Sequence, residues 1–339
     1  MRLAPLVLLV AILSGCGSAA VEVAQTEPSL REPAIGTGVD LVMRQESTNP
    51  TDVGPALLIV ETPVRIERLT DTADGAARYR WRRGETRLLD SIGGGMPQDL
   101  AAREPLLDIL RSQLAPTFEI WEGVAFELLY DAEQGYAGLG NFEQVRETAR
   151  ASFEQINATR VAAGLSAGWS PQMIERLLER DTLELVIAKE AVAFLAFLNV
   201  GELQVGESTA SVVENPSFMG FGPLDLQLTL RLREAADGEA GDVVLEVGDA
   251  TFEPEQFAEW YDAYARSRQR QVREEEVREL ANRVVFENDS KWHFADGDGW
   301  PLLAETASSA QMPGEAPGRR EVVRYRRADA TGPIDDGDE

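Results

Sequence analysis

The chain has 339 residues, of which 44% are hydrophobic and 27% are charged. This length and composition predict a globular protein with a sizeable core, built as one large domain or two smaller ones. Acidic residues number 58 against 32 arginines and lysines, so the formal net charge is −26. A surface this negative repels phosphate backbones, which excludes nucleic acid as a partner.

Cys16 is the only cysteine in the sequence, and His293 is the only histidine. A chain with one cysteine cannot form an internal disulfide, and it offers no thiolate cluster to a metal. One histidine also excludes a histidine-rich zinc or iron centre. We therefore predict no metal site and no cofactor.

The first residues combine a positive charge at Arg2 with an apolar run from Leu3 to Leu13. The run is too short to cross a hydrocarbon core of about 30 Å as a helix, and it is typical of a signal peptide. It ends in Leu13-Ser14-Gly15-Cys16, which resembles the lipobox of bacterial lipoproteins. The resemblance implies removal of residues 1–15 and lipidation of Cys16, through which the protein would be anchored to a membrane.

Gly17 follows the cysteine, at the position where an aspartate retains many such lipoproteins in the inner membrane. The resemblance therefore implies an outer-membrane lipoprotein that faces the periplasm. Residues 16–36, which include the lipidated cysteine, are mostly small and polar, and they predict a flexible tether with a reach of about 25 Å. The acidic residues 328–339 predict a disordered tail. The folded part is expected to be 37–327.

Alternation of apolar and polar residues predicts antiparallel strands at both ends of the folded part. The clearest example is Leu224–Leu232, where a leucine occupies every second position. The other predicted strands lie at 39–43, 58–66, 79–81, 118–130 (one long strand or a bent pair hinged at Gly123), 243–247, 283–287, 292–294, 302–306 and 321–327.

The middle of the chain, 141–199, is predicted to be helical, with Asn141 as a helix N-cap. Its last segment, 182–199, is apolar nearly all round but contains Lys189 and acidic residues, which indicates a buried helix and not a membrane span. An earlier helix near 98–114 is expected to be divided at Pro105.

We therefore predict an α+β fold, with antiparallel β-sheets at both ends of the chain, a helical middle and a buried central helix at 182–199. The ends could form two β-rich lobes, 37–135 and 200–327, joined by helices 141–199. A helix in the hollow of an antiparallel sheet is found in envelope carriers of lipids and lipoproteins. The order of elements loosely resembles such envelope lipoproteins.

Two short motifs could carry chemistry. Gly164-Leu165-Ser166-Ala167-Gly168 resembles the G-x-S-x-G elbow of α/β-hydrolases, but that motif needs a strand before the serine, and here a helix is predicted. A helix–helix loop is the favoured interpretation. Asp296-Gly297-Asp298-Gly299 could suggest calcium, but position twelve of such a loop would be Ala307, so a hairpin turn is favoured.

The anchor, the tether, the buried helix and the missing catalytic motifs favour a non-enzymatic, lipid-anchored protein of the cell envelope. It would bind or carry a hydrophobic molecule or bind an envelope protein. The alternatives are an envelope serine hydrolase centred on Ser166 and a structural subunit of an envelope complex. The sequence does not predict which residues would bind a ligand.

Overall fold

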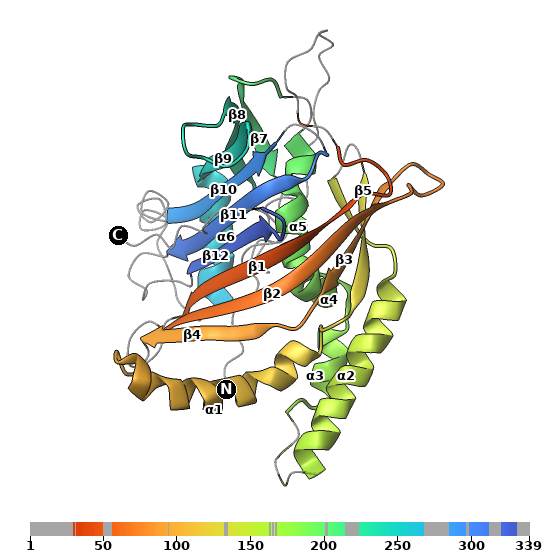
Figure 1. Cartoon of the computed structure of the whole chain (residues 1–339), viewed down its shortest axis with the longest axis vertical. Helices are drawn as coiled ribbons and strands as arrows, with labels where there is room; N and C mark the ends of the chain where they lie inside the picture. Colours follow the sequence, from red (N-terminus) through yellow and green to blue (C-terminus); the bar gives the residue numbers. More distant parts are fainter. Residues whose placement is uncertain are drawn as a thin grey trace.

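The computed structural model describes residues 30, 32–49, 56–93, 95–131, 135–162, 164, 166, 168–200, 203–213, 224–267, 285–295, 298–311 and 320–330. Its strands form a twelve-stranded antiparallel sheet (Figure 1). The strand order is β6-β5-β3-β2-β1-β12-β11-β10-β9-β8-β7, and β4 pairs with β2 beside this path.

The strands are β1 (Gly38–Asn49), β2 (Ala56–Leu69), β3 (Ala77–Arg83), β4 (Arg87–Gly93), β5 (Ala125–Asp131), β6 (Gly135–Leu139), β7 (Ser208–Val213), β8 (Leu226–Glu234), β9 (Val243–Phe252), β10 (Val285–Phe294), β11 (Pro301–Gln311) and β12 (Arg320–Arg327). The helices are α1 (Leu100–Glu119), α2 (Phe142–Ala162), α3 (Pro171–Leu177), α4 (Arg180–Ile187), α5 (Lys189–Leu195) and α6 (Pro254–Ser267), and a 3-10 turn, η2 (Ala196–Val200), follows α5.

The predicted α+β fold, with separate sheets at both ends of the chain and a helical middle, is wrong. Strand β1 pairs with β12 from Leu41 opposite Arg327 to Thr48 opposite Arg320, which joins the strands of both ends into one sheet. Alternation along a strand shows which face a side chain takes, but it does not show which strand pairs with which. The segment 182–199, predicted as one helix, is divided among α4, α5 and η2.

The two faces of the sheet differ in chemistry. The face that carries Met43, Trp81, Trp292 and Tyr325, here called the inner face, is part of the main hydrophobic core. The opposite, outer face carries a row of ion pairs, in which Arg324 bonds both Glu46 and Glu305. This distribution follows from the period of two along each strand, which separates apolar from charged side chains.

Helix α1 is continuous through Pro105, so the predicted division is wrong. It extends to Glu119, so the predicted strand at 118–130 is wrong at its start, and β5 begins only at Ala125. Asp99 caps the helix by accepting a hydrogen bond from the Ala102 N–H at 3.0 Å. Pro105 lies near this end of the helix and is exposed, as is Ala101, the residue whose carbonyl the proline ring would approach. Leu107 on the opposite side packs in a small separate core under β2 and β4.

Helix α2 begins where predicted, and the carbonyl of Asn141 accepts its first hydrogen bond, from Val145 at 3.1 Å, but the Asn141 side chain bonds β5. This side chain accepts from the Glu127 N–H at 2.8 Å and donates to the Ala125 carbonyl at 3.1 Å, so it fixes the helix start to β5. Among the described residues, no helix is long and apolar enough to cross a membrane. The predicted signal peptide, Cys16 and the segment 331–339 lie outside the described residues.

The β8–β9 hairpin requires glycine at 241. A Cβ atom there would lie 2.4 Å from the Phe294 carbonyl oxygen, and φ is +78°. Gly238 in the same hairpin has φ +93° but open space around its Cα. We predict that Gly238→Ala costs about 1 kcal/mol of unfolding free energy, the usual cost of the left-handed conformation. Gly241→Ala should cost clearly more, because the end of β10 must also move. Urea unfolding of both variants measures the difference, and equal losses would contradict the close contact.

Candidate functional site

Helix α5 is enclosed on all sides. Each of its seven residues is buried, including Lys189 and Glu190. It lies against the sheet, behind the strands in the view of Figure 1. A surface helix exposes one polar side to water, so complete burial shows that α5 fills an interior space.

The sheet bends around α5. The Phe194 ring lies 6.0 Å from the ring of Trp81 on β3, and its carbonyl accepts a hydrogen bond from Trp292 on β10. Four strands separate β3 from β10, so a flat sheet would place them about 24 Å apart. A helix with its side chains is only about 10–12 Å wide. One residue can contact both strands because the sheet forms a hollow around the helix.

Aromatic side chains line this hollow. Tyr325 on β12 lies 5.1 Å from the ring of Phe194 and 6.3 Å from that of Trp81. Phe197 in η2 lies 5.2 Å from Phe294 on β10. These rings meet edge-on or tilted, the arrangements that aromatic pairs prefer. The wall of the hollow is therefore apolar over most of its length.

Two hydrogen bonds hold the backbone of α5 to the wall. The Trp292 indole N–H donates to the Phe194 carbonyl at 2.8 Å, and the Tyr325 hydroxyl donates to the Glu190 carbonyl at 2.7 Å. Burial raises the pKa of Tyr325 well above its usual value, which keeps the hydroxyl protonated as a donor. These donors lie in the apolar wall, and an unmade bond there would leave a buried polar group without a partner.

A single ion pair lies at the first turn of α5. The Lys189 ammonium bonds the Glu321 carboxylate of β12, and Gln45 of β1 donates to the other Glu321 oxygen. Both charged side chains are at least nine-tenths buried. Ser47 and Ser308 are the cross-strand neighbours of Glu321, and both are buried. Glu321 thus lies in a small polar area of a mostly apolar wall.

Two buried polar atoms near this end have no hydrogen-bond partner in the described part of the chain. One is Oε2 of Glu190 on the helix, and the other is Oγ1 of Thr306 on β11. Thr306 is the cross-strand neighbour of Val323, one inner-face position along β12 from Glu321. The polar end of the hollow therefore has unused hydrogen-bonding capacity on the helix and on the sheet.

Sequence reasoning did not identify this polar end. The Lys189–Glu321 pair joins residues 132 positions apart, and pairing at that distance has no local pattern. The available signal was a lysine within an apolar helix, in a chain that contains only one other lysine, Lys291. Burial of that helix implied a partner for the lysine but did not identify it.

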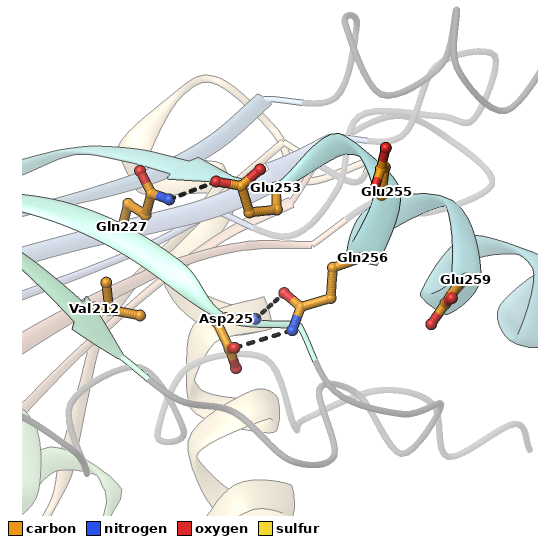
Figure 2. Close-up of a pocket in the computed structure, with 7 residues that line it drawn as sticks. All are labelled: Val212, Asp225, Gln227, Glu253, Glu255, Gln256 and Glu259. Carbon is orange, nitrogen blue, oxygen red and sulfur yellow. Dashed lines mark hydrogen bonds between the residues drawn. The ribbon is translucent and has the colours of Figure 1, made fainter.

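A second concave site lies near the start of β8 (Figure 2). This pocket of about 390 Å³ is lined by Val212, Asp225, Gln227, Glu253, Glu255, Gln256 and Glu259. Gln256 donates to the Asp225 carboxylate at 2.9 Å, and Gln227 donates to Glu253 at 3.0 Å. Its lining is acidic with one apolar side chain, so it does not suit a hydrophobic molecule.

The described structure lacks the strand before Ser166 that the nucleophile elbow of a serine hydrolase would need. Helix α2, and not a strand, precedes Ser166, whose carbonyl accepts from Arg160 at 3.2 Å. His293 lies on β10, where burial lowers its pKa and Nδ1 is 3.2 Å from the Ala240 carbonyl. The last turn of α2, which precedes Ser166, and β10 are far apart in Figure 1.

The predicted hairpin near Asp298 is only partly described, because residues 296 and 297 lie outside the described residues. The Asp298 carboxylate accepts from the Trp300 N–H at 3.0 Å and from Arg327 at 2.7 Å. No group of three or more metal-ligating side chains occurs among the residues that the structure describes.

The hydrogen bond from Tyr325 to α5 has a matched control in Tyr130. Both hydroxyls are buried, but that of Tyr130 has no partner among the described residues. We predict that Tyr325→Phe lowers the unfolding free energy by about 1–3 kcal/mol, because the Glu190 carbonyl loses its donor. Tyr130→Phe should be neutral or stabilising. Urea unfolding measures both, and equal losses would show that the hydroxyl does not hold α5.

No family model matches the chain, and no curated protein matches it. Among solved structures, "Lipid-protein interactions in lipovitellin" has a TM-score of 0.39 and 11% identity, and the match covers 89% of this chain and 26% of that one. This chain therefore spans about a quarter of the length of that lipovitellin chain. DynF from the dynemicin biosynthesis pathway of Micromonospora chersina has a TM-score of 0.19 and 8% identity, covering 91% of this chain and 93% of that one. Neither similarity is close enough to assign a family or an activity.

Proposed function

We propose that the protein is a non-enzymatic binding or carrier protein for a hydrophobic molecule, tethered to the bacterial outer membrane by a lipid on Cys16 and facing the periplasm. The observation that carries the binding role is the hollow around α5. A sheet that bends around one short helix encloses an apolar space of the kind that a hydrophobic ligand needs.

Helix α5 fills the hollow, so a ligand can bind there only by taking the place of the helix. If α5 moved out unaccompanied, the rings of Trp81, Trp292 and Tyr325 would face water, at a cost of about 25 cal/mol for each Å² of apolar surface. An incoming molecule removes this cost by covering the same rings, and it must also accept the hydrogen bonds that Trp292 and Tyr325 donate to α5. Helix α5 therefore leaves when a ligand takes its place, and the empty, open form is rarely populated.

The chain has structural breaks at both ends of α5 that suit such a movement. Ala188 separates α4 from α5, and α5 gives way to the 3-10 turn η2 after Leu195. A seven-residue helix makes few internal hydrogen bonds, so most of its stability comes from packing in the hollow. Once displaced, α5 loses that packing and can change its path.

Native mass spectrometry tests the binding role. The protein is purified from membranes of cells that produce it, and its mass is compared before and after extraction with organic solvent. We expect one bound apolar molecule per chain, released by the solvent. An empty protein that also fails to change its tryptophan fluorescence on addition of long-chain alcohols would contradict the proposal, because Trp81 and Trp292 line the hollow.

The anchor is tested separately. We predict that Cys16→Ser removes the lipid and moves the protein from the detergent-rich phase to the aqueous phase in a phase-separation assay, because two or three acyl chains dominate membrane affinity. Ser14→Ala in the same motif keeps a small residue before the cysteine and serves as the control. A Cys16→Ser protein that still partitions like the wild type would show that the anchor is not on Cys16.

A further inference from the structure

We infer that the hollow selects an amphiphile with an apolar body and an ammonium head, and that Glu321 binds the head. This inference rests on the proposed binding role and specifies its ligand. It starts from the occupant that the structure shows, because α5 presents to the sheet a mostly apolar body with one ammonium group near its start.

The wall matches both parts of this occupant. Lys189 meets Glu321 on β12, and further along the strands the apolar residues Phe194 and Phe197 meet Trp292 and Phe294 on β10. The carboxylate is at one end of the hollow and the aromatic rings occupy the rest. An amphiphile with its head at Glu321 would lay its apolar body along the same rings.

Displacement of α5 removes the ammonium group of Lys189 from the Glu321 carboxylate. Lys189 pairs with Glu321, and it belongs to the helix that leaves. Gln45 stays, but a neutral amide does not compensate a buried carboxylate. An incoming molecule with an ammonium head replaces Lys189, whereas a carboxylate head would place like charges together.

The unpartnered hydroxyl of Thr306 can form a further hydrogen bond at the end of the hollow that contains Glu321. It lies on β11 within the polar area that includes Ser308, and both side chains belong to the sheet, so they remain when α5 leaves. An ammonium group has three donors, and it can bond a hydroxyl while it pairs with a carboxylate. A compact ammonium also fits the place of a lysine better than a planar guanidinium does.

Titration with three matched probes tests the inference. Dodecylamine, dodecanol and dodecanoate share one apolar chain and differ in the head. Each is added below its micelle concentration to the full chain carrying Cys16→Ser, and tryptophan fluorescence is followed. We expect dodecylamine to bind at least about tenfold more tightly than the other two, because a charged hydrogen bond is formed in a buried site.

Three variants assign this preference to a residue. Glu321→Gln should abolish the preference for the amine. Glu305→Gln makes the same change on the outer face, where Glu305 bonds Arg324, and should keep it. Lys189→Met removes the internal competitor for Glu321 and should tighten amine binding. Thermal unfolding of each variant checks that it is folded. If either single variant is unstable, the double variant Lys189→Met/Glu321→Gln, which removes both buried charges, is tested for the preference in its place.

The outcomes separate the inference from the proposed function. Equal binding of the three probes, unchanged by Glu321→Gln, would overturn the ammonium site while the carrier role stands. Binding of none of them would overturn both. Lysophosphatidylethanolamine and lysophosphatidylcholine then distinguish the source of the head. Preference for the ethanolamine lipid over dodecylamine indicates a lipid headgroup, and the reverse indicates a free alkylamine.

Discussion

Two hydrogen bonds from the sheet to the backbone of α5, donated by Trp292 and Tyr325, fix the helix in the hollow. Apolar packing has little directional preference, so without these bonds the helix could slide or rotate among the rings. Each donor belongs to a large aromatic side chain, so the same residue packs against the helix and forms a directional hydrogen bond with it. The burial of Lys189 and its contact with Glu321 depend on this placement.

The molecule separates its charges into two groups with different roles. On the outer face, Arg324, Glu46 and Glu305 form an ion-pair row that water reaches, and such pairs contribute little stability individually. The Lys189–Glu321 pair is withdrawn from water, where breaking it by removing one partner is costly. The exposed charges interact with water, whereas the buried pair is the one that we propose distinguishes one ligand head from another.

The sequence predicted local features well and long-range ones poorly. The alternating leucines of β8 follow from neighbours along the chain, and the structure contains this strand. Strands β1 and β12 lie near opposite ends of the folded part of the sequence, and they pair with each other. The alternation of apolar and polar residues does not show this pairing. For the same reason the burial of Lys189 could be predicted, but its pairing with Glu321 could not.

The pairing of β1 with β12 has a consequence for how the protein is made. Translation delivers β1 near the beginning and β12 near the end, yet the two are neighbours in the middle of the sheet. Until β12 arrives, β1 presents an open edge of backbone amides and carbonyls to other chains. A chain that ends before residue 320 lacks β12, so its strands can form only two separate half-sheets. Each half-sheet has an exposed edge that favours aggregation. Correct assembly thus depends on holding the early half soluble until the last strand has been synthesised.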